Sequence, residues 1–507
     1  MGWLDNAISF IAPSWGYRRA AWRQEIDRLR SYDAGADDRL NAGWRVSNNS
    51  AEMTDRYQRD VVRARGRDLE RNSDFMKSIL RAGKRNVVGA GFQLQAKTDN
   101  PALNSEIEQL WADWCKARNC DVTGQQSFVE MCRMATVRKK VDGGIIFLKC
   151  YTNTGILPFS LQALEVDELD SMSMSLNPKH SGNRVVGGIE YNAYNRPVGY
   201  FIKKYDINGY TSLEPEYIPA KDVIFYWSKE RPSQIREMTE VAATMPRIRD
   251  ISEFMTAVSV KERIAACLAV FIKRVTPAAA RVQNAIGRFG NQTDEDRIYE
   301  GLKLTPGMIK ELRPEEEIDV VNPAGQGQSA AEFIRLQQRI MGAGQGLSYE
   351  TPSRDMSQVN YSSARQGLIE DELTYVEEQQ ALKEKFMAEV YETFLISAVL
   401  SGQLSIPDFW ERKRDYMKHV WISPARKWID PTKESSANKT AMETGQKTFA
   451  QITAENGRDW KEQIDEMAEI QEYAKSKGVK LGGGSFGGTA AESKPTMDAP
   501  AGNTANG

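Results

Sequence analysis

The spacing of apolar residues in the first half of the chain changes from helical to extended. In the run FMKSILRAGKRNVVGAGF, apolar positions recur at helical spacing and stop near Gly89, which predicts a helix followed by a strand. Residues 104–118 and 126–139 are two further predicted helices. The apolar run 143–151 is typical of a buried strand, and residues 158–230 alternate with a period of two between turn signals. These patterns predict an α+β fold with a β-rich or mixed lobe.

Two long helices and one shorter helix are predicted in the second half of the chain. Residues 247–272 form the first long helix, which Pro246 should open or kink. The shorter helix begins near Ser329, a candidate N-cap that Glu332 completes as a capping box. The second long helix covers 361–399, and its first half is acidic. Each long helix has an apolar face, made by Ile248, Ile251, Met255 and Val258 in the first and by Leu382, Phe386, Val390 and Phe394 in the second.

The segments around the shorter helix differ in composition. Within 276–328, LTPGMIKEL and EEEIDVVNP predict two strands joined by a turn at Arg313-Pro314. A Gly-rich loop, 344–360, follows the shorter helix. The end of the chain from Gly482 is rich in Gly, Ala, Ser and Pro with few apolar residues, which predicts disorder.

Charge and hydropathy narrow the class of protein. The chain has 507 residues, of which 41% are apolar, so it can bury a substantial core. It carries 67 basic and 69 acidic residues, which argues against a protein that grips nucleic acid by bulk positive charge. No apolar run reaches the roughly 18 residues of a membrane span. The N-terminal stretch has neither the pattern of a signal peptide nor that of an anchor, so we expect assembly in a cytoplasm.

Candidate chemistry is sparse. The five cysteines form no CxxC pair and the only histidines are His180 and His419, so we expect reduced thiols in the core and no metal site. The GAGQG run ending at Gly346 lies at the end of a predicted helix, whereas a dinucleotide-binding loop precedes a helix. The sequence also contains no P-loop motif, so we expect no cofactor. A Ser-His-Asp triad would have to recruit one of two distant histidines, so we expect no catalytic residues.

One motif carries a resemblance to a known family. The run GQGLSYETPSRDMSQVNYSSAR resembles the lambda-type portal proteins of tailed phages, in which a Gly-rich helix end is followed by a Ser-Tyr-Glu step and then by Asp-x-Ser-x-x-Asn-Tyr-Ser-Ser-x-Arg. The matching positions are Gly344, Gly346, Ser348, Tyr349, Glu350, Asp355, Ser357, Asn360, Tyr361, Ser362, Ser363 and Arg365.

Other stretches resemble the same family in the same order. They are LTPGMIKELRPEEEIDVVNP, RDLERNSDFMKSILRAGKRNVVGAGF, CDVTGQQSF, RPSQIRE and WISPARKWIDPTKESSANKTAMETG, so the similarity runs from about 15 to 470. One position departs from the pattern, because relatives tend to have Gly where RPSQIRE ends in Glu237.

The resemblance implies a portal fold of wing, stem, clip and crown that assembles into a ring, usually of twelve subunits, around a central channel. The implied parts are an N-terminal arm at 1–40, the wing at 41–246, the first stem helix at 247–275, the clip at 276–328, the second stem helix at 329–343, the tunnel loop at 344–360, a long wing and crown helix at 361–399, the crown and C-terminal region at 400–475, and a disordered tail at 476–507.

The resemblance also implies which residues meet DNA and partner proteins. The DNA-facing residues of the tunnel loop would be Gly344, Gly346, Ser348, Tyr349, Arg354, Asp355, Ser357, Asn360 and Tyr361. The docking residues of the clip would be Pro306, Gly307, Arg313, Glu315, Glu316 and Glu317. Alternatively, the three glutamates are carboxylates of a turn that face solvent and bind no partner. Arg354 and Arg365 could instead pair with acids of a neighbouring subunit, which is the interpretation we favour.

The function implied is that of the ring at one capsid vertex through which double-stranded DNA is packaged and ejected. The implied partners are other copies of the chain, the large terminase subunit, the major capsid and scaffolding proteins, a head-completion or adaptor protein, and DNA that passes without sequence preference, with no membrane. Two other classes stay open. A capsid-maturation protease fused to a structural domain would need a Ser/Lys or Ser/His constellation, which no motif places here. A capsid-binding adaptor or scaffold would lack an axial hole.

Overall fold

The computed structural model describes residues 48–171, 177–266, 271–273, 310–312, 327–357, 360–425 and 430–479, with a few residues between 13 and 22. By its contacts, the chain divides into two units. One unit contains residues 1–58 and 230–235, and the other contains 59–229 and 236–507. The predicted strand EEEIDVVNP and the predicted disorder beyond residue 482 lie outside the described residues.

In the first unit, helix α3 (Ala51–Asp55) follows an N-cap serine. The Ser50 side chain accepts a hydrogen bond from the backbone N–H of Met53. The backbone N–H of Ala51 donates to Ser233 Oγ at 2.9 Å, and Arg231 donates to the carbonyl of Asn49 at 3.1 Å. These bonds join the two parts of the sequence that make up this unit.

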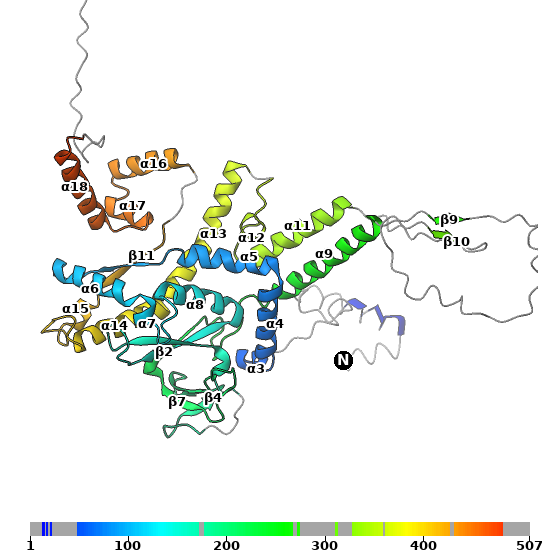
Figure 1. Ribbon diagram of the computed structural model, residues 1–507. Helices are drawn as coiled ribbons and strands as arrows, with labels where there is room; N and C mark the ends of the chain where they lie inside the picture. Colours follow the sequence, from blue (N-terminus) through cyan, green and yellow to red (C-terminus); the bar gives the residue numbers. More distant parts are fainter. Residues whose placement is uncertain are drawn as a thin grey trace, which may run out of the picture. The chain divides into compact units, whose positions relative to one another are not determined.

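The second unit alternates helices and short strands (Figure 1). Its first part contains α4 (Arg59–Asn72), α5 (Asp74–Gly83), a π-helical turn (Lys84–Val88), β1 (Gln93–Ala96), α6 (Pro101–Trp114), α7 (Ala117–Cys120), α8 (Phe128–Asp142), β2 (Gly144–Cys150), β3 (Ser160–Leu164), β4 (Arg184–Val186), β5 (Ile189–Tyr191), β6 (Pro197–Ile202), β7 (Glu216–Pro219) and β8 (Val223–Trp227). Its second part contains α9 (Met245–Ala266), β9 (Phe271–Lys273), β10 (Lys310–Leu312), α11 (Gly327–Gly344), α12 (Glu350–Ser353), α13 (Tyr361–Leu382), a second π-helical turn (Lys383–Met387), α14 (Ala388–Leu400), α15 (Lys413–Tyr416), β11 (His419–Ile422), α16 (Pro431–Glu443), α17 (Phe449–Glu455) and α18 (Trp460–Ser476).

Local sequence explains where α8 begins and ends. The Ser127 side chain accepts from the N–H of Glu130, whose carboxylate accepts from the N–H of Ser127, which makes a capping box. The helix ends at Gly143, where φ is +88° and a Cβ atom would lie 2.6 Å from the backbone of Met238. Only glycine fits this turn without strain, so α8 passes directly into the buried strand β2.

The strands confirm the predicted β-rich region. β2 lies between β3 and β8 in an antiparallel sheet, and β4 to β7 form a second antiparallel sheet in sequence order. β1 pairs with β11, more than 300 residues away in the sequence. β9 pairs in parallel with β10, which lies at the end of the predicted strand LTPGMIKEL.

Aromatic side chains fill the centre of the second unit. Trp111 and Trp114 of α6 contact Phe128 of α8 and Phe394 of α14, with ring centroids 5.0–5.7 Å apart. The four residues Leu382, Phe386, Val390 and Phe394 are fully buried, which confirms the predicted apolar face of the second long helix. Buried surface of this kind is the main favourable contribution to folding.

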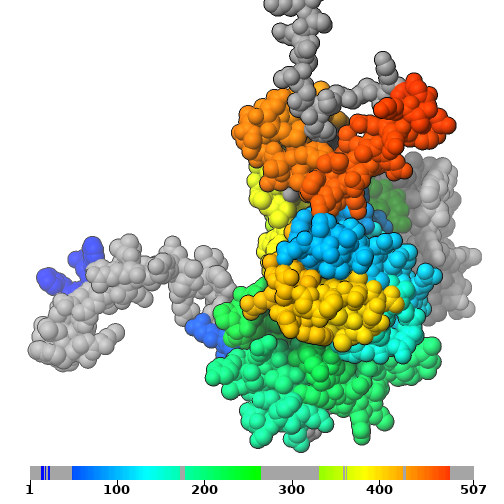
Figure 2. Space-filling model, turned by 90° about the vertical axis from the view of Figure 1, so that its left-hand side faces the viewer, coloured from blue at the N-terminus to red at the C-terminus, as the bar shows by residue number. Residues whose placement is uncertain are grey.

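The surface of this unit brings distant segments together. In Figure 2, α6 (blue) lies between α18 (red) and the segment 401–416 (yellow). Gln93 of β1 donates to Glu462 of α18 at 2.8 Å, and Arg412 donates to Asp99, just before α6, at 3.0 Å. The C-terminal helices are therefore tied to β1.

Three predictions about the helices of the second half of the chain were incomplete or wrong. α11 begins at Gly327, so Ser329 lies inside the helix and is not its N-cap. Ile248 and Ile251 of α9 are buried, but Met255 is half exposed, so only the first turns of the predicted apolar face pack against the core. The predicted helix 361–399 contains the π-helical turn Lys383–Met387, where one extra residue fits into the turn.

A buried ionic network lies where the Glu237 position departs from the family pattern. Glu237 is fully buried, and its carboxylate accepts hydrogen bonds from Arg63 at 3.1 Å and from Arg236 Nε at 2.7 Å. Arg59 Nε donates to the carbonyl oxygen of Glu237 at 2.9 Å. The glutamate therefore fixes the turn before α9 by charge pairing.

Candidate functional site

The Gly-rich end of α11 turns sharply back toward α13. Gly346 has a φ of +66°, and a Cβ atom there would lie 2.6 Å from Thr374 Oγ1. That hydroxyl donates to the carbonyl oxygen of Gly346 at 2.7 Å. Gln345 Nε2 donates to Thr244 Oγ1 at 3.2 Å, just before α9. Position 346 therefore requires a glycine, and hydrogen bonds with Thr374 and Thr244 hold the turn in place.

One buried carboxylate anchors the residues after this turn. Asp371 of α13 is 1% exposed. It accepts hydrogen bonds from the backbone N–H of Ser348, from Ser348 Oγ at 2.9 Å, and from Thr351 Oγ1. Ser78 of α5 donates to the carbonyl of Pro352 at 2.6 Å. Residues 345–353 are therefore held against α5 and α13.

A second carboxylate orders the residues that follow α12. Asp355 accepts from Tyr349 OH at 2.9 Å, from Ser357 Oγ at 2.6 Å and from the N–H of Ser357 at 3.0 Å. The bonds from Ser357 and Tyr349 lower the pKa of Asp355 to about 2. Arg335 of α11 lies 4.0 Å from the carboxylate. Asp355 is therefore negatively charged throughout the neutral pH range.

The exposed part of the loop is its second half. Arg354 is exposed and has a φ of +60°, in the left-handed region that few non-glycine residues adopt. Met356, Ser357 and Asn360 are also exposed, and Asn360 caps α13 by accepting from the N–H of Ser363 at 2.9 Å. We define residues 354–360 as the loop tip. Among the described residues from 347 to 360, the fully exposed ones all lie in this part.

The structure brings some of the predicted site residues together and leaves others outside its description. Ser348, Tyr349, Asp355 and Ser357 share two hydrogen-bonded clusters. Gly344 ends α11 and is exposed, and α13 begins at Tyr361. The predicted docking residues Pro306, Gly307, Arg313, Glu315, Glu316 and Glu317 lie outside the described residues. No sequence signal marks the anchors Asp371 and Thr374, since acids and polar residues recur all along α13.

Replacing Asp371 by alanine should loosen the loop. The variant leaves the N–H of Ser348 without its acceptor, and one lost buried hydrogen bond costs about 1–3 kcal/mol. We expect trypsin to cleave after Arg354 about tenfold faster than in the wild type, since local opening controls cleavage. Glu384→Ala, which removes an exposed carboxylate further along the same helical run, is the control. Equal cleavage rates for Asp371→Ala and the wild type would contradict the anchoring role.

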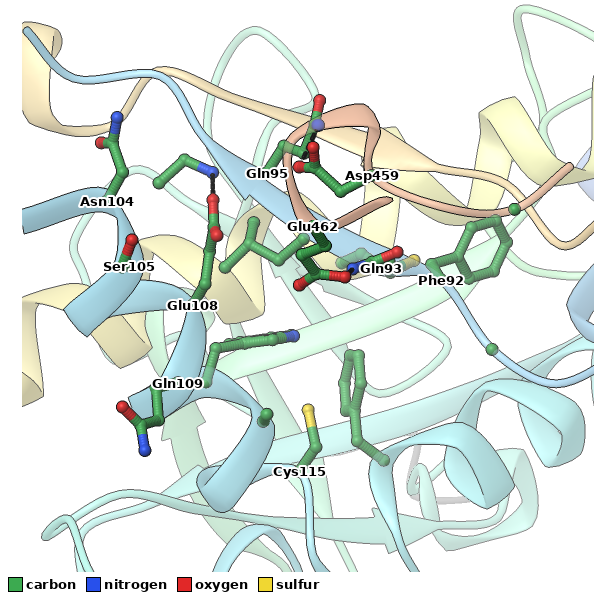
Figure 3. Close-up of a pocket in the computed structure, with 18 of the residues that line it drawn as sticks. Phe92, Gln93, Gln95, Asn104, Ser105, Glu108, Gln109, Cys115, Asp459 and Glu462 are labelled. Carbon is green, nitrogen blue, oxygen red and sulfur yellow. Dashed lines mark hydrogen bonds between the residues drawn. The ribbon is translucent and has the colours of Figure 1, made fainter. Parts of the chain in front are cut away.

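A cavity of about 630 Å³ lies between β1, α6 and the start of α18 (Figure 3). Its polar groups are bonded to one another: Glu108 accepts from the N–H of Ala96 at 2.7 Å, and Gln95 donates to Asp459. Burial, helped by the charges of Asp459 and Glu462, raises the pKa of Glu108. The first bond joins α6 to β1, and the second joins the start of α18 to β1.

The groups considered for catalysis or metal binding have structural partners. His180 bonds to Glu190 at 3.1 Å, and His419 bonds to the carbonyl of Met417 at 2.7 Å. Burial raises the pKa of Cys120 to about 12 and that of Cys132 further, so these thiols stay protonated. Across the described ranges, no three His, Cys, Asp or Glu side chains are grouped so that they could hold a metal ion. None of the helices within those ranges combines the length and the apolar character that a membrane crossing needs.

Known proteins that are similar to the chain agree on one family. The sequence model of the phage portal protein, lambda family, matches residues 37–379. The chain is 27% identical over 474 residues to a probable portal protein of Halomonas phage phiHAP-1, covering 90% of this chain and 89% of that protein. It is 19% identical to portal protein B of Escherichia phage lambda, covering 82% and 84%.

A solved structure, the virion of a native gene transfer agent particle, aligns with 79% of this chain and 93% of its own at 11% identity and a TM-score of 0.37. The family match spans more than half of the sequence, in agreement with the motif at 344–365. The chain therefore belongs to the lambda family of phage portal proteins.

Proposed function

We propose that the chain forms a ring at one capsid vertex and that double-stranded DNA enters and leaves the capsid through the ring. The observation that supports this most directly is the helix pair α9 and α11, which lie side by side in Figure 1 and bracket residues 267–326. Phe254 and Phe333 stack edge to face, with ring centroids 5.0 Å apart. A stem made of two packed helices that flank a clip needs this arrangement.

The other parts of the portal follow from this assignment. Residues 41–246 are the wing, 247–275 and 329–343 the stem helices, and 276–328 the clip. Residues 344–360 are the tunnel loop, 361–399 the long wing and crown helix, and 400–475 the crown. Of the tunnel loop, the tip at 354–360 is the part that would contact DNA, because the residues before it are held by Asp371 and Thr374.

A channel should let DNA slide. Each phosphate that a protein neutralises adds a counterion-release contribution to affinity, so a tight electrostatic grip would stall movement. The loop tip combines one exposed arginine, Arg354, with the charged carboxylate of Asp355. Its local charge is therefore balanced, which suits contact without tight binding.

The partners and the absence of catalysis belong to the same proposal. The clip docks the large terminase subunit during packaging, and then a head-completion or adaptor protein. The capsid and scaffolding proteins surround the ring, which is assembled in the host cytoplasm and remains in the virion. The chain acts as a structural protein and not as an enzyme, so the energy for packaging comes from the terminase.

The ring can be tested by electron microscopy of the purified protein, with its mass from light scattering. We expect a ring of about a dozen subunits with an axial hole at least as wide as duplex DNA, about 20 Å. A closed particle without a hole would favour the adaptor class. A chain that stays monomeric even with its capsid partner present would contradict the channel. Proteolysis of the capsid protein by the purified chain would favour the protease class.

A further inference from the structure

Two helices of the second unit expose apolar stripes. On α13, Ile369, Leu373 and Val376 follow i, i+4, i+7 spacing and are 45%, 64% and 42% exposed. This stripe lies opposite the packed face of the helix, where Asp371, Tyr375 and Leu382 are buried. We call it the α13 face. An apolar stripe of this length on a soluble helix usually marks an interaction surface.

The second stripe lies on α11. Phe333, Leu336 and Ile340 follow i, i+3, i+7 spacing and are 41%, 54% and 39% exposed. Ile334 and Met341 point instead to the core side of the helix. We call the stripe the α11 face. Both faces are partly exposed in one copy of the chain, where Phe333 also meets the ring of Phe254 of α9, and they do not cover each other within that copy.

The net charges beside the two stripes are opposite. Exposed Glu370 and Glu377 lie on one side of the α13 face, and one exposed basic residue, Arg365, precedes Ile369 by one turn. Arg335 and Arg339, both exposed, lie beside the α11 face, with one exposed acid, Glu332, on the same side. Arg335 is 4.0 Å from Asp355, and Arg339 lies over the ring of Tyr349, so the loop holds both guanidiniums in place on this side of α11. Charges of opposite sign around two apolar stripes favour contact between unlike faces and oppose contact between two α13 faces.

We infer that the α13 face of one subunit packs against the α11 face of the next copy of this chain. A contact between two different faces is head-to-tail, and it closes into a ring when the rotation between copies allows. The inference rests on the proposed ring and identifies the surfaces that build it. It also places the tunnel loop, which joins α11 to α13, between the two interface helices of each subunit.

A mixing experiment tests this assignment. Leu373→Asp removes the α13 face and Leu336→Asp removes the α11 face, and both side chains are more than half exposed, so both variants should fold. Each variant alone should stay monomeric to a protein concentration at least about tenfold above that at which the wild type assembles. A 1:1 mixture should give a dimer of one copy of each variant and no ring, because one intact pair of unlike faces remains. Leu400→Asp, 68% exposed at the end of α14, is the matched control and should form rings.

The readouts are mass by light scattering and particle shape by electron microscopy, with circular dichroism to check folding. If either variant fails to fold, Ile369→Asp and Ile340→Asp take their places. Rings formed by either variant would overturn the assignment while leaving the proposed function intact. Dimers formed by Leu336→Asp alone would show that two α13 faces pair with each other. If the wild type assembles but the 1:1 mixture of the two variants stays monomeric, the α13 and α11 faces do not contact each other. A wild type that never forms a ring contradicts the proposed function, and this inference with it.

Discussion

Replacing Trp111 by alanine is expected to lower the free energy of unfolding by about 3–5 kcal/mol, the usual cost of truncating a buried tryptophan. Trp111 is 4% exposed and meets the rings of Trp114, Phe128 and Phe394. It also meets Tyr391 and Trp421, so it joins α6 to α8, α14 and β11. Its removal leaves a space that four separate elements would have to close. Urea unfolding followed by far-ultraviolet circular dichroism measures the change.

The control for this prediction is another tryptophan. Trp410 is 59% exposed, and its ring meets that of Phe409. Its replacement by alanine should change the free energy of unfolding by less than about 1 kcal/mol. Equal effects of the two substitutions would mean that the aromatic cluster does not hold α6, α8 and α14 together. Trp111 also lines the cavity beside β1, so a small effect would mean that its neighbours can move into that space.

The periodic parts of the fold could be predicted from the sequence. The i, i+4 spacing of Leu382, Phe386, Val390 and Phe394 identified a face that is fully buried. The apolar run before Cys150 identified the central strand β2. Such patterns are local, because a helix or strand repeats its buried positions at a fixed interval along the chain. The start of α11 was misplaced because an isolated Ser-x-x-Glu pattern occurs both at caps and inside helices.

The candidate site was predictable in position but not in structure. The motif from Gly344 to Arg365 identified the loop and its family. The division of that loop into a fixed part and an exposed tip depends on Asp371 and Thr374, more than 20 residues away. The sequence contains many similar acids on α13, and only the packing of that helix decides which one faces the loop. Glu237 is a similar case, because one of its two arginine partners, Arg63, lies 174 residues away in the sequence.

Replacing Glu237 by alanine is expected to lower the free energy of unfolding by about 3–5 kcal/mol, as for other buried ion pairs that lose one partner. Arg236 is 1% exposed, and two of its three guanidinium nitrogens donate to this carboxylate. Without the Glu237 carboxylate, Arg236 still donates hydrogen bonds to the carbonyl oxygens of Gly187 and Val166, which carry no full charge. Arg63 is less affected, since Asp60 and Asp167 also pair with it. Thermal and urea unfolding measure the loss.

Two further variants distinguish the cost of leaving a buried charge without its partner from the cost of losing a single contact. Glu253→Ala removes the partner of Arg249 in an exposed pair on α9, and it should leave the unfolding midpoint unchanged because water screens such pairs. The double variant Arg236→Met, Glu237→Ala should recover at least about 1 kcal/mol of the loss, because the buried charge that lost Glu237 is then absent. If the double variant is no more stable than Glu237→Ala, the bonds of Arg236 to Gly187 and Val166, which only the double variant loses, stabilise the fold by at least as much as removal of the charge does. In that case the arginine would hold the β4–β5 turn against the segment before α9 through those carbonyls, and the glutamate would serve mainly to neutralise it.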